Sequence, residues 1–385
     1  MRKLWMIVAA VFFGINAAAV NGKLFINATN VTTEGRDAET ISIPLIDLGA
    51  AEVRKPAIYC EKLGRFVASQ YIDNNADGIF DEIVFQTDIK AKQTMIFEVV
   101  EANAANQVEV LDGSAAYYVP QRKDDFAWEN DKIAFRVYGQ ELQRTELTSS
   151  GIDVWVKKVQ KPVMPKLYIK GHDYYHSDNP LGIDFYNVGP SLGCGGLGAW
   201  YDGKLLLSQN YNEWKIIANG PIRTIFELTY RQWNVGGGKK TGEVKRITLD
   251  KGWNFNKIES KFSNNVKDVK FAVGIVKCER GGNATFGILN EYMGYWQKID
   301  KNFGIIGCGV ILSPDSVINE KREDQDNNML LAEAKDNFVV YYAGACWNKN
   351  KGFETEEKWN ALIRQTERRI KNPVKIEYKQ KFGKR

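Results

Sequence analysis

The sequence predicts an all-β sandwich, and three features of the chain support this fold class. Short runs such as TISIPLIDL, KIAFRVYG, GIDVWVKKV and RTIFELTYRQW alternate between apolar and polar residues. Turn signals such as DG, NG and GGG stand between these runs. Helical periodicity is almost absent outside residues 355–370. Period-two alternation bounded by turn residues is typical of strands with one buried face, so we expect many short strands in packed sheets.

A secretory signal is expected over residues 1–22. Arg2 and Lys3 precede an apolar run at 4–13, and three alanines follow at 17–19. A charged start, a short apolar segment and small residues together describe an export signal. The apolar run is shorter than the roughly 20 residues that span a bilayer. We therefore expect a periplasmic or secreted protein that has no membrane contact once the signal is removed.

Two domains are expected in the remainder of the chain, because a typical domain has about 150 residues. Residues 23–112 carry closely spaced strand patterns and predict a small N-terminal β-sandwich. The stretch EANAANQVEVLDGSAA is rich in small and charged residues and predicts a linker. Residues 113–385 predict a larger β domain with one helix, from Thr355 to Ile370. Thr355 can cap this helix, and its apolar residues fall near one face.

Composition narrows the range of functions. The 52 basic and 47 acidic residues leave a net charge of only +5, and no basic block suggests a nucleic-acid arm. The five cysteines have irregular spacing that matches neither a disulfide framework nor a zinc motif. The 17 tyrosines and 10 tryptophans are more than packing demands and suit stacking on sugar rings. A sugar ligand is therefore favoured over nucleic acid.

The segment DNNADGIFDE, at residues 73–82, resembles a calcium-binding loop in its spacing. Oxygen-bearing side chains occupy positions one, three, five and nine, at Asp73, Asn75, Asp77 and Asp81. Gly78 at position six permits a sharp turn. The loop departs from an EF-hand because position twelve is Val84 and no helices flank it. Two interpretations remain open, a structural calcium site and a polar hairpin.

A second segment, RKDDFAWENDKIAFRVYG at residues 122–139, combines charged side chains with a tryptophan. Either Arg122 or Arg136 could present a planar fork to a ligand carboxylate. Trp128 could form a platform for a sugar ring. The alternative is structural: the arginines could pair with acidic neighbours in the same segment, namely Asp125, Glu129 and Asp131.

Both histidines of the chain, His172 and His176, lie in YIKGHDYYHSDNPLGIDFYNVG. On a strand they would share a face with Tyr174, although the nearby glycines and proline are equally compatible with an irregular loop. Zinc binding would need a helix and a third ligand, and neither is evident. A histidine base with a tyrosine acid needs only hydrogen-bond reach. The alternative is two histidines that are merely satisfied in a polar loop.

Five motifs in this order carry a family resemblance: YIDNNADGIFDEIVFQ, RKDDFAWENDKIAFRVYG, HSDNPLGIDFYNVGPSLGCGGLGAWYDGKL, NGPIRTIFELTY and YYAGACW. Together they resemble domain of unknown function family 4861, exported proteins of Bacteroidota polysaccharide-utilisation loci. The resemblance implies a β-supersandwich related to galactose mutarotase and to polysaccharide-lyase β-domains. One similar protein is an ulvan oligosaccharide dehydratase. This sequence has Asn75 and Ala76 where the family suggests an acidic residue and a glycine.

The resemblance and the motifs together predict β-elimination on a uronic-acid-containing oligosaccharide. Such a reaction needs a base at carbon 5, an acid for the oxygen that leaves carbon 4, and a cation for the carboxylate. Candidates for these roles are, respectively, His172 or His176, Tyr175 or Tyr174, and Arg122 or Arg136. Further candidates for orientation or substrate contact are Asp184, Tyr186, Glu129, Trp128 and Trp200. No organic cofactor is expected, because no cofactor motif occurs.

Two other functions compete with elimination. A glycoside hydrolase on rhamnogalacturonan- or ulvan-type oligosaccharides would use two carboxylates. The candidates for that pair are Asp125, Glu129, Asp131 and Asp184. A non-catalytic sugar-binding protein would keep the tryptophans and would not need the histidine and tyrosine cluster. In each case the expected partner is an oligosaccharide, and for elimination it is anionic.

Overall fold

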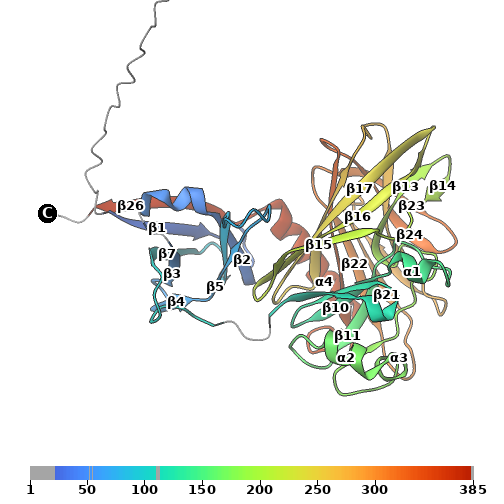
Figure 1. Cartoon of the computed structure of the whole chain (residues 1–385), viewed down its shortest axis with the longest axis horizontal. Helices are drawn as coiled ribbons and strands as arrows, with labels where there is room; N and C mark the ends of the chain where they lie inside the picture. Colours follow the sequence, from blue (N-terminus) through green and yellow to red (C-terminus); the bar gives the residue numbers. More distant parts are fainter. Residues whose placement is uncertain (1–21, 52, 54, 110–112, 383–385) are drawn as a thin grey trace, which may run out of the picture.

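The computed structural model describes residues 22–51, 53, 55–109 and 113–382, and these form two lobes joined side by side (Figure 1). Strands dominate both lobes, which confirms the predicted all-β class. The expected signal segment lies outside the described residues except for Gly22. Within the described ranges, no helix is long and apolar enough to cross a membrane.

The smaller lobe is a sandwich of two sheets around its own apolar core. One sheet has the order β26-β1-β7-β3-β4 and the other β2-β6-β5. Their inner faces meet in a core that includes Ile26, Ile58, Phe85 and Phe97. The N-terminal elements are β1 (Gly22–Thr29), β2 (Arg36–Pro44), a 3₁₀ turn η1 (Leu45–Ala51), β3 (Pro56–Cys60), β4 (Arg65–Val67), β5 (Ser69–Ile72), β6 (Glu82–Ile89) and β7 (Thr94–Glu101). The run TISIPLIDL thus changes from strand to 3₁₀ turn after Pro44.

The last strand of the chain, β26 (Lys375–Phe382), belongs to this smaller lobe. It pairs antiparallel with all of β1, from Gly22 opposite Phe382 to Thr29 opposite Lys375. Val374 and Ile376 pack against the small core. The expected domain boundary at residues 113–385 therefore needs a correction, because the chain returns to the first lobe after it has built the second.

The larger lobe packs three sheets around one core, as a large sandwich. The first sheet contains β8 (Ala115–Val119), β9 (Asp125–Glu129), β10 (Ile133–Val137), β11 (Asp153–Lys157) and β12 (Gly182–Asp184). The second contains β13 (Cys194–Tyr201), β14 (Lys204–Leu206), β19 (Lys270–Val276), β23 (Val317–Glu323) and β24 (Asn327–Glu333). The third contains β15 (Glu213–Asn219), β16 (Arg223–Gly236), β17 (Lys239–Asp250), β18 (Phe255–Phe262), β20 (Gly282–Phe286), β21 (Tyr292–Gln297), β22 (Ile306–Leu312) and β25 (Phe338–Trp347).

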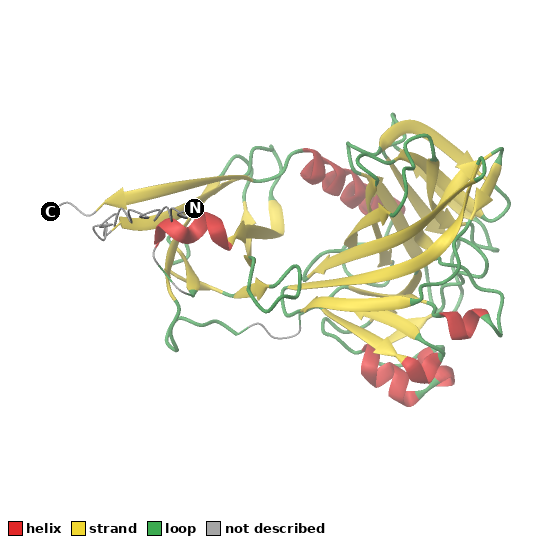
Figure 2. Cartoon of the chain, turned by 45° about the horizontal axis from the view of Figure 1, so that its top comes forward, coloured by secondary structure: helices red, strands yellow, loops and turns green. Residues whose placement is uncertain are grey.

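The predicted helix is present as α4 (Glu356–Lys371), at the junction of the lobes (Figure 2). Thr355 caps it, because its side chain accepts a hydrogen bond from the Lys358 amide at 3.4 Å. Trp359 and Ile363 are buried on one helix face. Trp359 stacks parallel to Phe255, with ring centroids 5.3 Å apart.

Two short helices cover the outer face of the first sheet, α2 (Met164–Lys170) and α3 (His172–Tyr175). A third, α1 (Gln140–Gln143), follows β10. The histidine segment is therefore neither the strand nor the loop expected for it. Gly171 separates α2 from α3 with φ +92°, a left-handed value that favours glycine. Every residue of β9, β10 and β11 is buried, because the core covers one face and α2 and α3 cover the other.

The loop between β5 and β6 is a hairpin held by its own backbone. The Asp73 carboxylate accepts amide hydrogen bonds from Ala76, Asp77 and Gly78 at 2.7–3.2 Å. Asp81 accepts another from Asn74 at 2.6 Å. In the part of the chain that the structure describes, no three acidic, histidine or cysteine side chains come together to hold a metal ion. These hydrogen bonds describe a polar hairpin, and the calcium site stays a prediction.

The two interpretations of this loop predict different melting behaviour. With its carboxylates turned to backbone amides, we expect the same melting temperature in excess calcium and in excess chelator, because no bound ion adds to folded-state stability. Thermal melts followed by circular dichroism measure this. A melting temperature that rises when calcium is added, with this rise abolished by Asp77→Ala, would instead establish a structural calcium site.

Candidate active site

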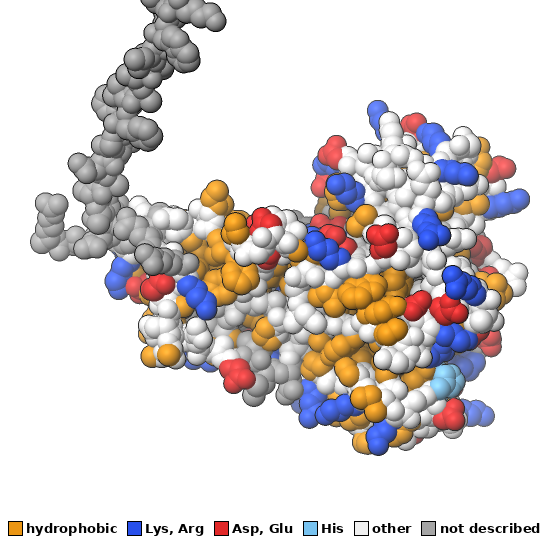
Figure 3. Space-filling view, in the orientation of Figure 1, with side chains coloured by type: hydrophobic (Ala, Val, Ile, Leu, Met, Phe, Trp, Pro, Cys, Tyr) orange, Lys and Arg blue, Asp and Glu red, His pale blue; other side chains and the backbone are white. Residues whose placement is uncertain are grey.

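A pocket of about 480 Å³ lies between β8, α2 and α3 on the larger lobe. Arg122, His172 and Tyr175 line it, which brings together three residues that the sequence singles out for catalysis. Figure 3 shows histidine on the surface of this part of the lobe. Tyrosines contribute much of the remaining wall, at Tyr117, Tyr118 and Tyr168. The volume and the mixed lining are typical of a small-ligand site.

Aromatic packing fixes the position of α3 against the sheet. Tyr175 is buried, and its ring lies 4.5 Å from that of Trp155 on β11. Because α3 is helical, His172 and His176 stand one turn apart, with ring centroids separated by 4.3 Å. The ring of His172 is 5.4 Å from that of Tyr175. The sequence spacing therefore yields a compact cluster, although the geometry is helical.

Arg122 reaches Tyr175 from the opposite wall of the pocket. It ends the 3₁₀ turn η2 (Pro120–Arg122), and Lys123 and Asp124 then adopt left-handed φ values of 52° and 62° that turn the chain into β9. The Arg122 Nε donates a hydrogen bond to the Tyr175 hydroxyl at 3.2 Å. Among the described residues, no carboxylate forms an ion pair with Arg122. Partial burial opposes the charge, yet the Tyr175 contact and the Asp125 charge raise the arginine pKa overall, so it stays cationic.

His176 lies behind His172 and does not line the pocket. Its Nδ1 is 2.8 Å from the backbone carbonyl of Asp184, so this nitrogen carries the proton and donates. Its Nε2 lies 3.6 Å from the Asp184 carboxyl. Burial lowers the pKa of His176, which keeps the ring neutral near pH 7. Tyr174 does not line the pocket either, and it packs against the apolar cluster that includes Trp155, Met164 and Leu167.

Arg136 lies beneath the pocket and is fully engaged. Its side chain is buried among three carboxylates from neighbouring strands: Asp153 Oδ2 at 2.9 Å from Nε, Asp184 Oδ2 at 2.8 Å from Nη2, and Asp125 Oδ2 at 3.4 Å from Nη1. Its guanidinium also stacks 4.8 Å from the Trp155 ring. Arg136 therefore has no free edge for a ligand carboxylate, and of the two candidate arginines only Arg122 faces the pocket.

This buried cluster contains three carboxyl groups and only one guanidinium group. Burial raises the pKa of Asp125 to about 6, against the opposing effects of Arg136 and Arg122. Burial also raises the pKa of Asp184 well above its ordinary value. One oxygen of each, Oδ1, has no hydrogen-bond partner within the described structure. The Tyr168 hydroxyl lines the pocket and donates to Asp125 at 3.2 Å, so a polar chain connects the pocket to the cluster.

The two tryptophan candidates do not reach the pocket. Trp128 is fully buried and donates its indole N–H to Asn256 at 2.7 Å, with its ring stacked 5.6 Å from Phe135. It offers no ring face to a sugar, because Trp128 points into the core. Trp200 is half-buried against the cluster around Leu192 on another sheet. The stacking surfaces at the pocket are tyrosines instead.

The other polar candidates have structural partners. Glu129 is buried and forms an ion pair with Lys157 at 2.7 Å. Its carboxylate also accepts hydrogen bonds from the backbone amides of Val163 and Met164, where α2 begins. Asp131 accepts the Gly252 amide at 2.6 Å. Tyr186 is buried, and its hydroxyl lies 3.5 Å from Cys308 Sγ. These contacts account for the polar groups of the three side chains within the protein, so none of them needs a ligand.

Sequence reasoning missed the tyrosine wall of the pocket. Tyr117 and Tyr118 lie on β8, immediately before the charged motif, and Tyr168 lies on α2 within the stretch that contains the histidines. Tyr118 also stacks 4.9 Å from Trp214. Because these tyrosines lie next to the two motifs in the sequence, that proximity could have identified them as pocket residues.

The buried acid cluster predicts a pH-dependent stability. The unfolded Asp125 titrates near 3.9 and the folded one near 6, so the folded state resists ionisation and wild type loses stability as the pH rises between these values. Relative to Asp125→Asn, wild type should lose roughly 2–3 kcal/mol of unfolding free energy between about pH 4 and pH 7. Urea unfolding of both proteins across this range measures the difference.

The exposed Asp202, in the turn between β13 and β14, provides the control. Asp202→Asn should show no comparable change in its stability difference from wild type across the same pH range. An Asp125→Asn difference that is equally independent of pH would contradict a raised pKa for Asp125.

Comparisons with other proteins place the chain in a family. "Uncharacterized protein P7" of Formosa agariphila is 29% identical over 390 residues, which covers 97% of this chain and 98% of that protein. A protein in the glycosyl hydrolase family 38 from Enterococcus faecalis shares the fold with a TM-score of 0.51 at 8% identity, over 94% of this chain. An alpha-mannosidase from the same species gives 0.45 at 8% identity, also over 94%. The chain spans about half the length of these two structures, 47% and 46%.

The low identity to the two solved structures restricts that likeness to the fold. The family comparison covers far more of the sequence. The model of the family described as "Domain of unknown function (DUF4861)" matches residues 28–376, and the chain belongs to this family.

Proposed function

We propose that this protein is a carbohydrate-active enzyme that performs β-elimination on a uronic acid unit of an anionic oligosaccharide. The observation that carries this proposal is the placement of Arg122. Its guanidinium lacks a counter-ion among the described residues, contacts Tyr175, and shares a pocket with His172. An arginine without a counter-ion, beside a proton donor and a base, fits an anionic substrate that must lose a proton.

Support for a sugar substrate comes from two sources. Four tyrosines line the pocket and supply amphipathic faces that can pack against a sugar ring. The fold is also that of a protein in a glycosyl hydrolase family, although only the fold is shared. Because an export signal is expected, we propose that this activity occurs in the periplasm or outside the cell.

The proposed reaction begins with the proton on carbon 5, next to the substrate carboxylate. His172 accepts this proton on a ring nitrogen, and the electron pair of the C–H bond forms a double bond between carbons 4 and 5. The bond from carbon 4 to its oxygen breaks, and that oxygen takes the proton of the Tyr175 hydroxyl. A free hydroxyl leaves as water in a dehydratase, whereas a glycosidic oxygen leaves with the next sugar in a lyase.

Arg122 has two functions in this reaction. Its terminal nitrogens can bind the substrate carboxylate as a planar fork, where negative charge grows as carbon 5 loses its proton. Its Nε already donates to the Tyr175 oxygen, so the hydroxyl proton remains available to the leaving group. The same side chain thus binds the substrate and orients the acid.

His172 fits the role of base better than His176. The side chain of His172 is 60% exposed and lines the pocket, whereas that of His176 is 37% exposed and lies behind it. His176 uses Nδ1 to bind the Asp184 carbonyl. We assign His176 as a positioning residue that supports the His172 ring.

A hydrolase mechanism receives less support from the geometry. Three of its four candidate carboxylates, Asp125, Glu129 and Asp184, are buried and bound to cations. Asp131 is bound to the Gly252 amide, and none of the four lines the pocket. No two of them therefore flank a common space that could hold a glycosidic bond in this pocket.

Incubation with uronic-acid oligosaccharides tests the proposal directly. Elimination produces a double bond conjugated with the carboxylate, which absorbs in the ultraviolet, and mass spectrometry shows whether water or a sugar has left. Hydrolysis would release sugar without new absorbance, and simple binding would give neither signal. Sugar release without absorbance, across ulvan and rhamnogalacturonan fragments, would overturn the elimination mechanism.

Replacement of the base should abolish most turnover. His172→Gln retains a polar side chain but cannot accept the proton, so kcat should fall by about 10²-fold or more. The rate of ultraviolet absorbance increase measures this effect. His176→Gln should cause a smaller loss, because that ring only supports its neighbour. Full activity in both variants would mean that the histidines have a structural role.

Replacement of Arg122, the residue proposed to bind the substrate carboxylate, should impair both substrate binding and turnover. Arg122→Gln removes the cation on which charge develops, so kcat/KM should fall by about 10²-fold, with effects on both KM and kcat. Arg144, which is 71% exposed and pairs with Glu141 on the surface, provides the matched control. Arg144→Gln should leave both constants unchanged. An Arg122→Gln enzyme with normal kcat/KM would exclude the carboxylate clamp.

A further inference from the structure

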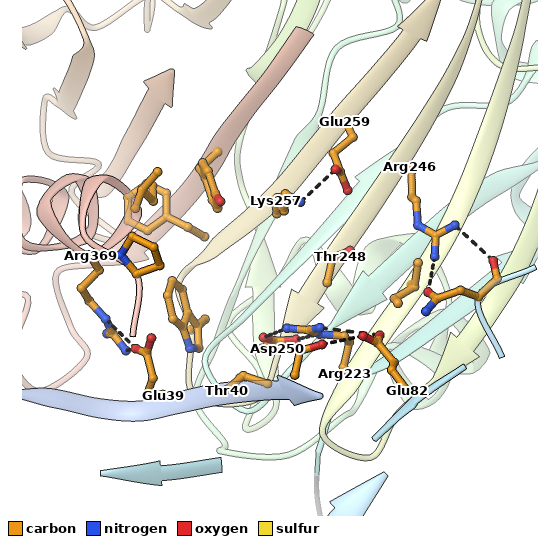
Figure 4. Close-up of a pocket in the computed structure, with 18 residues that line it drawn as sticks. Glu39, Thr40, Glu82, Arg223, Arg246, Thr248, Asp250, Lys257, Glu259 and Arg369 are labelled. Atoms are coloured by element: carbon orange, nitrogen blue, oxygen red, sulfur yellow. Dashed lines mark hydrogen bonds and ion pairs between the residues drawn. The ribbon is translucent and has the colours of Figure 1, made fainter. Parts of the chain in front are cut away.

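A second pocket, of about 470 Å³, lies where the two lobes meet. Its walls come from β2 and β6 of the smaller lobe, from β16, β17, β18 and β25 of the larger lobe, and from α4 (Figure 4). It shares no lining residue with the pocket of Arg122 and His172. In Figures 1 and 2, α2 and α3 lie away from the junction of the lobes. The two pockets are therefore separate sites.

The charges that line this second pocket balance one another. Four are acidic and four are basic: Glu39, Glu82, Asp250, Glu259, Arg223, Arg246, Lys257 and Arg369. Each basic side chain already has an acidic partner, as Figure 4 shows for several of them. The pairs are Arg223 with Asp250 at 2.7 Å, Lys257 with Glu259 at 2.8 Å, Arg246 with Glu227 at 3.0 Å, and Arg369 with Glu39 at 2.5 Å.

This balance disfavours an ionised ligand. A ligand carboxylate or sulfate would have to displace one of these partners and leave its carboxylate partly buried without a cation, which is costly. An uncharged ligand with hydroxyl groups could instead use the remaining lone pairs and N–H groups of the intact ion pairs. The pocket therefore differs in its preferred charge from the Arg122 pocket.

Two hydroxyl groups in the pocket are free to bind such a ligand. The side chains of Thr248 and Tyr342 line it, and within the described residues no hydrogen bond is made by either hydroxyl. Trp253 adds an aromatic surface, with the Arg369 guanidinium 4.4 Å from its ring. Hydroxyl groups, ion-paired carboxylates and an aromatic ring together match the alternating polar and C–H surfaces of a sugar.

The pocket is also preformed, because hydrogen bonds fasten the lobes on either side of it. Gln70 of β5 binds the backbone of Arg223 through both ends of its amide, at 2.8 and 2.9 Å. Gln86 of β6 donates to the Lys251 carbonyl at 2.8 Å. Asn74 accepts from Arg246 at 2.6 Å. A ligand would not have to order these walls, which lowers the entropic cost of binding.

We propose that the pocket between the lobes binds an uncharged, hydroxyl-rich sugar unit, independently of the elimination site. Thr248 and Tyr342 supply hydroxyl contacts, Trp253 supplies an apolar face, and the ion pairs supply further acceptors and donors. The two sites together would let one chain hold a mixed polysaccharide fragment that contains both acidic and neutral sugars.

Isothermal titration calorimetry with uncharged trisaccharides tests this proposal on the full chain. The probes are xylotriose, mannotriose and rhamnotriose, with trigalacturonic acid as the charged comparison. We expect at least one uncharged probe to bind. Tyr342→Phe and Thr248→Val each remove one hydroxyl at nearly constant volume, so each should weaken that binding about fivefold. Trigalacturonic acid should not compete with the uncharged probe at this pocket.

Tyr341→Phe is the matched control, because Tyr341 neighbours Tyr342 on β25 but is buried on the opposite face. It should leave probe binding unchanged, and thermal melts should show that all three variants are folded. His172→Gln should also bind the uncharged probe normally, which separates this site from the elimination site.

Three results would overturn the proposal. The first is that none of the uncharged probes binds to the folded protein. The second is that a probe binds but Tyr342→Phe and Thr248→Val both keep wild-type affinity. The third is that trigalacturonic acid binds more tightly than every uncharged probe and is weakened by the same two variants, which would make this an acidic-sugar site.

Discussion

The larger lobe depends on one buried arginine. Arg136 binds carboxylates from three other strands, Asp125 on β9, Asp153 on β11 and Asp184 on β12. Strand register brings them together, since Arg136 stands directly opposite Asp153 and these side chains share the outer face of the sheet. Removal of one member of such a buried group typically costs about 3–5 kcal/mol, because it leaves the others without compensation. The floor of the candidate active site is built on this cluster.

The cluster also explains why two arginines of one motif differ in chemistry. Arg136 lies within a strand, where α2 and α3 cover it and acidic neighbours surround it. Arg122 precedes a left-handed turn at the sheet edge, and its hydrogen-bond partner is the hydroxyl of Tyr175. The first arginine is used in folding and the second remains available to a ligand. Position relative to the covering helices, rather than residue type, decides between these two roles.

The sequence was sufficient for the strand pattern, for α4 and for the location of a histidine and tyrosine cluster. It was insufficient where distant segments decide the outcome. The outer face of β9 to β11 alternates in a way that indicates solvent, but α2 and α3 cover it, so Glu129 is buried. Helix α3 has four residues, too few for any periodicity to show. The pairing of β26 with β1 joins residues more than 340 positions apart, which no local pattern records.

That long-range pairing has a consequence for ligand binding. Because β26 completes the sheet of the smaller lobe and α4 immediately precedes it, the helix is anchored to both lobes. Arg368 and Arg369 at the end of α4 pair with Glu34 and Glu39 of the smaller lobe, at 2.7 and 2.5 Å. The junction is thus held by chain connectivity as well as by side chains. A ligand between the lobes would meet walls whose spacing is already set, so its affinity would depend on complementarity to that space and would not require the lobes to close.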